Sequence, residues 1–159
     1  MAYDIAQICL NGHITNDSVN RYPVDSKNYC DTCGSKTIKE CQSCKVAIQG
    51  AMYSEYSYEA LENPPSYCIH CGDAFPWINL ALEAAEELAN IIDELGEHDK
   101  KILTDSLAEL VKDTPRREVA VIKVKSILKG LDSHFSDGFK NILYNVLSNL
   151  SLKRYGDPN

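Results

Sequence analysis

The sequence predicts an α+β protein, in which two consecutive small β modules precede an all-α bundle of about four helices. Two observations lead to this prediction. All seven cysteines lie between Cys9 and Cys71, in a segment rich in turn residues, whereas from Ile78 onward apolar residues recur at helical spacing. We therefore expect one domain over residues 1–77 and a helical domain over 78–159. The boundary falls at Phe75-Pro76-Trp77, because proline is favoured in the first turn of a helix.

The cysteines occur in short pairs, each spaced so that one tight turn presents two side chains to a single metal ion. The pairs are Cys9-x3-His13, Cys30-x2-Cys33, Cys41-x2-Cys44 and Cys68-x2-Cys71. They supply enough soft ligands for two tetrahedral sites, and thiolate and imidazole without carboxylate favour zinc. We therefore predict two structural Zn²⁺ ions per chain and interpret the β modules as zinc ribbons. An odd number of cysteines argues against a disulfide framework, and the histidine argues against a rubredoxin-type iron site in the first tetrad.

Two pairings of these turns are open. Consecutive pairing gives site 1 from the first two pairs and site 2 from the last two, whereas interleaved pairing joins the first pair with the third and the second with the fourth. Gly34 and Gly72 follow the second and fourth pairs, where a residue with positive φ lets backbone N–H groups turn toward sulfur. These two pairs therefore resemble the closing turns of two similar units, which favours consecutive pairing. The predicted ligands are Cys9, His13, Cys30 and Cys33 for site 1, and Cys41, Cys44, Cys68 and Cys71 for site 2.

Short strands are expected around these turns. Residues 3–9 and 13–19 flank the first pair, and residues 45–58 suggest a hairpin that turns near Gly50. Such strands are too short to enclose a sizeable hydrophobic core. We expect the metal ions to replace that core, as in small zinc domains that are unfolded without metal.

The helical domain is expected to contain four amphipathic helices. They are predicted over residues 78–95 and 98–112, then from Thr114-Pro115 with Thr114 as N-cap, and finally from near Ser133 to Gly156-Asp157-Pro158. Their apolar sides are formed in turn by Ile78, Ala81, Ala85, Leu88, Ile92 and Leu95; by Ile102, Leu103, Leu107, Leu110 and Val111; by Ala120, Val124, Ile127, Leu128 and Leu131; and by Phe135, Phe139, Ile142, Leu143, Val146, Leu147 and Leu150. Helices of this length could form a small bundle.

Charge is divided along the helical domain. The whole chain has a formal net charge of -7, which disfavours generic binding of nucleic acid because that affinity comes mostly from Lys and Arg. Residues 83–111 are strongly acidic and residues 112–154 are basic. One interpretation is that acidic helices pack beside basic ones. The other is a basic surface that meets an acidic partner, formed by Arg116, Arg117, Lys123, Lys125 and Lys129.

The sequence predicts neither export nor membrane insertion. The N-terminal residues lack the basic start and apolar core of a secretion signal. No apolar run approaches the roughly 18–20 residues that cross a bilayer. We therefore expect a cytoplasmic protein whose thiols stay reduced, with no membrane partner.

The sequence gives no sign of an enzyme. With all eight ligands assigned, both sites should be closed and structural, whereas a catalytic zinc keeps an open position. HExxH, GxSxG, Walker A and dinucleotide-binding patterns do not occur. His70, His98 and His134 are expected at turns, helix starts or in solvent, so we assign no catalytic residue.

Three functions remain under consideration. The first is a non-catalytic zinc-binding protein, whose ribbons form a rigid platform and whose helical region mediates protein–protein interaction or self-association. Tyr53, Tyr56, Tyr58 and Trp77 could anchor such an interface, although packing around the metal sites is an alternative role for them. The second is a nucleic-acid-binding zinc-ribbon protein that stacks bases on these tyrosines. The third is a thiol-redox or zinc-responsive switch.

The spacing of the four turns, with Phe75-Pro76-Trp77 after the last, resembles an uncharacterised bacterial family with paired N-terminal zinc ribbons and a C-terminal helical region. The resemblance covers essentially the whole chain. It implies two ions on the positions named above and supplies no activity. The helical region from Thr114-Pro115-Arg116 is also similar to tails of some bacterial abortive-infection proteins, which implies a role in bacterial stress or phage defence.

Overall fold

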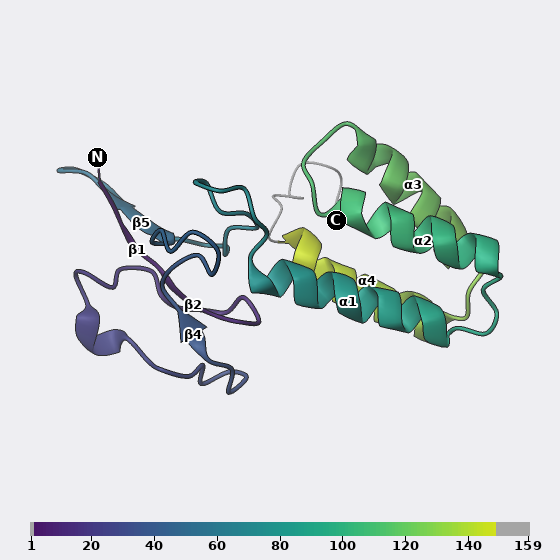
Figure 1. Cartoon of the computed structure of the whole chain (residues 1–159), viewed down its shortest axis with the longest axis horizontal. Helices are drawn as coiled ribbons and strands as arrows, with labels where there is room; N and C mark the ends of the chain where they lie inside the picture. Colours follow the sequence, from purple (N-terminus) through teal and green to yellow (C-terminus); the bar gives the residue numbers. More distant parts are fainter. Residues whose placement is uncertain (1, 149–159) are drawn as a thin grey trace. The chain divides into compact units, whose positions relative to one another are not determined.

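The computed structural model describes the backbone of residues 2–148 and the side chains of residues 2–142. The chain divides between Trp77 and Ile78 into two compact units. The first unit contains the strands and the second contains helices (Figure 1). This confirms the predicted α+β class. No helix among the described residues is both long and apolar enough to span a bilayer.

The first unit contains two small antiparallel sheets. Their strands are β1 (Ala2–Ile5), β2 (Gln7–Cys9), β3 (Ile14–Asn16), β4 (Thr37–Ile38), β5 (Gln49–Tyr53) and β6 (Tyr58–Glu59), and the strand orders are β3-β2-β4 and β1-β5-β6. Only Ala6 separates β1 from β2, so one continuous stretch of chain supplies a strand to each sheet. The two zinc ribbons expected from the sequence are therefore joined through their sheets, because the N-terminal strand β1 pairs with β5 of the second ribbon.

The expected hairpin turn at Gly50 is wrong. Gly50 lies inside β5, and the chain turns back between β5 and β6, over residues 54–57. The backbone at Gly50 runs against two other segments, because a Cβ there would lie 2.1 Å from the carbonyl oxygen of Asp17 and 2.8 Å from the carbonyl carbon of Ile5. Glycine is needed here for close approach of backbones where β5 meets the junction of the two sheets.

Buried polar side chains hold the long loop between β3 and β4. The Asp4 carboxylate accepts hydrogen bonds from the backbone N–H groups of Asn20 (2.8 Å) and Arg21 (3.3 Å). The Gln7 amide accepts from the backbone N–H of Lys27 (2.9 Å) and donates to the carbonyl of the same residue (2.8 Å). Both side chains are buried, and these bonds satisfy them while fixing a loop that has little apolar surface of its own.

The second unit contains α1 (Pro76–Ile91, whose first residues precede the division), α2 (Glu97–Leu110), α3 (Arg116–Leu128) and α4 (Ser133–Ser148). Figure 1 shows α2 running antiparallel beside α3. Residues from all four helices form one apolar cluster: Ala85, Ala89, Ile92, Leu95, Leu103, Leu107, Leu110, Ala120, Val124, Leu128 and Phe139. The predicted side chains of Leu143, Val146, Leu147 and Leu150, and the predicted helix end at Gly156-Asp157-Pro158, lie outside the described residues.

The predicted helix cap at Thr114 is wrong, and α4 has a cap that was not predicted. The Thr114 side chain does not cap α3. Instead its carbonyl accepts the N–H of Arg117 at 2.9 Å, and the helix begins at Arg116. At the start of α4 the Asp132 carboxylate accepts the N–H of His134 at 2.8 Å, which satisfies one of the N–H groups that every helix start leaves unpaired.

Candidate metal centre

The three CxxC pairs lie on turns of the same construction. In each turn the first cysteine accepts, through its carbonyl, the N–H of the residue four positions later. Its own N–H donates to the carbonyl of the residue five positions later. The first set of bonds runs from Gly34 to Cys30 (2.8 Å), Lys45 to Cys41 (3.0 Å) and Gly72 to Cys68 (2.9 Å); the second runs from the same cysteines to Ser35, Val46 and Asp73 (2.8 Å each). An isolated antiparallel bridge closes each turn, Tyr29 to Lys36, Glu40 to Ala47 and Tyr67 to Ala74.

The residue after the second cysteine has a positive φ in all three turns. Gly34 (72°) and Gly72 (79°) adopt this conformation readily, as the sequence suggested. Lys45 occupies the same position in the Cys41–Cys44 turn with φ of 63°, which is unfavourable for a residue with a Cβ. Sequence reasoning missed this position because no glycine marks it. The only sequence signal was its place immediately after a CxxC pair.

Site 1 has the geometry of a tetrahedral metal site. The Cys9 Sγ lies 3.7 Å from the Cys33 Sγ and 3.5 Å from the His13 Nδ1, and the Cys30 Sγ lies 3.6 Å from the same nitrogen. Tetrahedral zinc with ordinary bond lengths places two sulfurs about 3.8 Å apart, and a sulfur and a nitrogen about 3.6 Å apart. These three separations match both values, so the ligand atoms are spaced as one tetrahedral ion requires.

Site 2 repeats this arrangement with four sulfurs. The Sγ atoms of Cys41 and Cys71 are 3.7 Å apart, and those of Cys44 and Cys68 are 3.6 Å apart. Within each tetrad all four ligand atoms lie within 4.8 Å of one another. The structure therefore assembles the predicted ligands consecutively, the first two pairs in one site and the last two in the other. These distances suit a metal ion, and its identity depends on the chemistry of the ligands.

The two residues of each pair differ in exposure. The leading cysteines Cys9, Cys30, Cys41 and Cys68 are buried, whereas the second ligands face outward, with His13, Cys33 and Cys71 exposed and Cys44 half-buried. In each pair the leading cysteine is therefore buried, and the second ligand covers the metal position from the solvent side. Solvent and reagents reach the metal positions from the capping side.

Backbone N–H groups favour the thiolate form in both tetrads. The backbone N–H of Ser35 lowers the pKa of the Cys33 thiol to about 5, and the N–H of Cys71 lowers that of Cys68 to about 6. Burial raises the pKa of the Cys9 thiol to about 11. The Asn11 amide adds a donor 3.4 Å from the Cys33 Sγ. Thiolate is the form that binds metal, so the turns prepare part of each ligand set before an ion arrives.

Trp77 supports site 1 and is not an exposed anchor. Its indole N–H donates to the Pro65 carbonyl at 2.9 Å, its ring stacks on Phe75 at 4.8 Å, and only 4% of the residue is exposed. Atoms of Trp77 lie 3.1 Å from where a Cβ on Gly12 would stand, in the turn that joins Cys9 to His13. The Phe75-Pro76-Trp77 segment therefore packs beneath the first ligand pair.

The tyrosines are mostly engaged within the first unit. The Tyr53 hydroxyl is 2.8 Å from the Ser18 hydroxyl, and the Arg21 guanidinium lies 3.6 Å above the Tyr53 ring. The Tyr58 hydroxyl donates to the Asp17 carboxylate at 3.0 Å. Tyr56, which is 93% exposed, is the most open of the three hairpin tyrosines. Tyr53 and Tyr58 therefore pack locally, against residues that belong to neither tetrad rather than around the metal sites as expected.

The comparison with protein families agrees with the resemblance found in the sequence. A family model described as an uncharacterised protein conserved in bacteria (DUF2321) matches residues 2–154. The chain belongs to this family. No match was found among curated proteins or among solved structures. The DUF2321 description carries no activity, so membership of the family assigns no function to the chain.

Proposed function

We propose that this is a non-catalytic zinc-binding protein, in which two structural Zn²⁺ ions make the first unit a rigid platform and the helical unit mediates protein–protein interaction or self-association. One observation carries the proposal. Eight soft ligand atoms form two complete tetrads at the separations of tetrahedral zinc, and they come from turns of a single design. The resemblance to abortive-infection tails leaves a role in bacterial stress or phage defence as a prediction.

The ligand chemistry supports zinc over other metals. Three sulfurs with one imidazole nitrogen, and four sulfurs, are ligand sets of structural zinc sites, whereas calcium and magnesium take oxygen. A set of four cysteines can also hold iron, but the imidazole in site 1 disfavours a rubredoxin-type centre there. Residues His13, Cys33, Cys44 and Cys71 would cap the ions from the solvent side. When bound, the ions would hold the turns together and supply no open position for a substrate.

Metal analysis combined with native mass spectrometry tests the proposal. We expect two zinc ions per chain, and X-ray absorption that shows sulfur and nitrogen neighbours with no water oxygen. Replacing His13 with alanine should remove one ion. The matched control is His70→Ala, because His70 is exposed within the Cys68–Cys71 turn and its side chain is not part of the tetrad. Fewer than two ions in the wild-type protein, or an oxygen ligand, would overturn the closed structural assignment.

A redox switch is a second candidate, favoured by the exposure of Cys33 and Cys71. The Cys33 Sγ lies 3.7 Å from the Cys9 Sγ, within the reach of a small shift to a disulfide. In that reaction two thiolates form one S–S bond and give two electrons to hydrogen peroxide, which takes up two protons and becomes two water molecules. Peroxide should then release zinc, and a thiol reductant should restore its binding. Zinc retained under stoichiometric peroxide would exclude this role.

Nucleic-acid binding receives less support. The net charge of -7 opposes it, and Arg21 covers one face of the Tyr53 ring that a base would stack on. A salt titration with mixed oligonucleotides separates this alternative from protein binding. We expect no affinity at low ionic strength. Binding that weakens steeply with salt would reinstate the alternative.

A further inference from the structure

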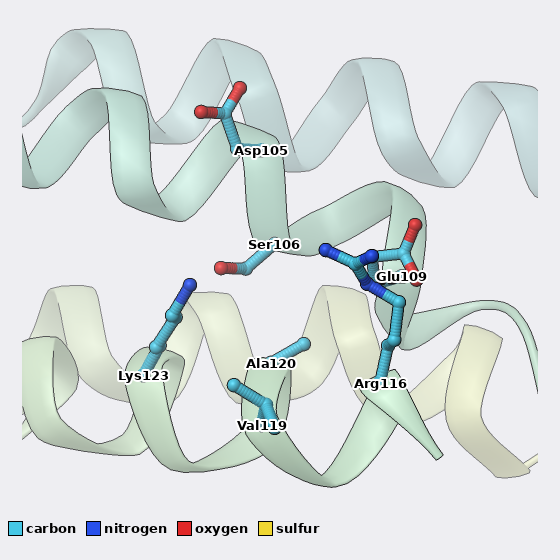
Figure 2. Close-up of a pocket in the computed structure, with 7 residues that line it drawn as sticks. All are labelled: Asp105, Ser106, Glu109, Arg116, Val119, Ala120 and Lys123. Atoms are coloured by element: carbon cyan, nitrogen blue, oxygen red, sulfur yellow. Dashed lines mark ion pairs between the residues drawn. The ribbon is translucent and has the colours of Figure 1, made fainter. Parts of the chain in front are cut away.

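The α2–α3 hairpin carries an open hollow on its outer face. The hollow has a volume of about 470 Å³ and lies between the two helices (Figure 2). Its lining comes from both helices and is formed by Asp105, Ser106, Glu109, Arg116, Val119, Ala120 and Lys123. Ser106 is buried and donates to the Ile102 carbonyl at 2.6 Å, so its polar atom is already satisfied.

The two walls of the hollow have opposite charge. Asp105 and Glu109 line it from α2, and Arg116 and Lys123 line it from α3 (Figure 2). Arg116 and Glu109 approach each other at 3.9 Å. Asp105 and Lys123 form no ion pair within the described part of the chain, although both border the same hollow. One acidic and one basic group therefore remain available to a partner.

Helix α3 also exposes apolar side chains. Val119 is 54% exposed and Ile122 is 68% exposed, one turn apart on the same helix. Val119 lines the hollow together with the charged residues Arg116 and Lys123, whereas Ile122 is not among the lining residues. Neither side chain belongs to the apolar cluster of the bundle. Apolar side chains ringed by charge are typical of the centre and rim of a protein interface.

We propose that this face binds a second copy of the chain. A two-fold axis that lies in the interface and runs parallel to the two helices, which lie side by side (Figure 1), places α2 of one copy opposite α3 of the other. The acidic α2 wall then meets the basic α3 wall of the partner twice, and the exposed Val119 side chain of each copy lies within the interface. This rests on the proposed function, since it names the partner of the helical unit.

The division of charge favours a second copy over an acidic partner. An acidic protein or nucleic acid would pair with Arg116 and Lys123 but would be repelled by Asp105 and Glu109 across the same hollow. A basic partner would pair with Asp105 and Glu109 but would be repelled by Arg116 and Lys123. A surface that carries both signs on parallel walls is complementary to its own two-fold mate.

Two charge-reversed proteins test this in the zinc-loaded full chain. One is Asp105→Lys with Glu109→Lys, which makes both walls basic, and the other is Arg116→Glu with Lys123→Glu, which makes both walls acidic. Each alone should dimerise about tenfold or more weakly than wild type, by analytical ultracentrifugation at low ionic strength. An equimolar mixture should associate again, because each basic wall then faces an acidic one.

Matched controls separate charge and folding from the interface. Glu86→Lys with Glu87→Lys makes the same change in net charge as Asp105→Lys with Glu109→Lys, but at exposed positions of α1, and should leave the dimer intact. Val119→Ser removes apolar surface without changing charge and should weaken the dimer. Circular dichroism and zinc content are recorded for every variant.

Three results would overturn the proposal: a wild-type protein that is monomeric at every concentration tested, reversed variants that dimerise as well as wild type, or a mixture that fails to associate although both variants are folded. A monomer that keeps two zinc ions refutes the dimer alone. Loss of the zinc ions from the wild-type protein refutes the structural zinc sites instead.

Discussion

The two units of this protein differ in the side chains that they bury. The helical unit buries apolar side chains from all four helices in one cluster. The first unit has a smaller apolar set, with Ile8, Ile38 and Ile48 among its buried residues, and it also buries Asp4, Gln7 and Asn16. Its strands are two to five residues long, so strand pairing alone supplies little stability.

Because of this difference, single positions contribute to stability in different ways in the two units. In the helical unit many interchangeable apolar contacts share the stabilisation, so single positions are replaceable within limits of volume. In the first unit a few cysteines, one histidine and a few buried polar groups each have a defined partner, so identity matters at every one. Removal of metal and single substitutions can therefore test one unit at a time.

Removal of metal is expected to have the largest effect. Structural zinc typically contributes about 10–16 kcal/mol of apparent binding free energy, which in small domains is folding free energy. A strong chelator should therefore unfold the first unit while the helices of the second remain. Hydrogen exchange by mass spectrometry would show loss of protection over residues 2–75 and retention over 97–128.

Zinc readded to the chelated protein is the control and should restore protection. If protection over residues 2–75 survived complete removal of metal, the first unit would not depend on metal for its folding. Its few buried apolar side chains and its buried polar hydrogen bonds would then be sufficient to keep it folded.

Leu107→Ala should produce the reverse pattern. Leu107 is fully buried in the helical cluster, and truncation of such a leucine costs about 2–5 kcal/mol through lost transfer free energy and a cavity. We expect a lower denaturation midpoint for the helices, with two metal ions still bound. The exposed neighbour Ala108 offers a matched control, since Ala108→Ser should change the midpoint little. Loss of metal from Leu107→Ala would show that the units depend on each other.

Gly50→Ala should destabilise the first unit. A Cβ at this position would lie 2.1 Å from the Asp17 carbonyl oxygen, and backbone atoms cannot move aside as a flexible side chain can. Forced overpacking of this kind costs about 1–3 kcal/mol or more. The measurement is the chelator concentration or temperature at which metal is released. Gly96→Ala is the control, because no atom lies within 4 Å of its Cβ position; an equal effect of the two would contradict the close approach.

The grouping of the seven cysteines and His13 into two tetrads was predictable from the sequence, because spacing alone encodes it. A tight turn can bring two side chains to one ion with no help from the rest of the chain, so Cys30-x2-Cys33 is recognisable locally. The helices of the second unit were also recognisable, since each repeats its apolar spacing over several turns. Consecutive pairing of the turns followed from Gly34 and Gly72, which mark the ends of two similar units.

The missed features depend on contacts between distant segments. Gly50 suggested a turn, but its role is an approach to Ile5 and Asp17, which lie far away in the sequence. Trp77 was a candidate for an exposed anchor, yet it lies against Gly12 and donates to the Pro65 carbonyl, contacts that no local pattern reveals. Strands of two residues, such as β4 and β6, carry no periodicity that could be detected.

Lys45→Gly is expected to have the smallest effect, and a stabilising one. Lys45 holds the positive φ that Gly34 and Gly72 hold in the equivalent turns, and a left-handed conformation costs a residue with a Cβ about 1–2 kcal/mol. Part of this gain is lost because glycine gives the unfolded chain more freedom, so we expect about 1 kcal/mol of added stability in the second ribbon. Competition with a zinc chelator should show tighter retention at site 2 and no change at site 1.

The reciprocal change, Gly34→Lys, is the matched control. No atom lies within 4 Å of the Cβ position at Gly34, so the substitution changes backbone strain without steric conflict. It should weaken site 1 by a similar amount. If Lys45→Gly weakened zinc retention, the lysine side chain would have a stabilising role that outweighs the strain, and the three CxxC turns would not be equivalent.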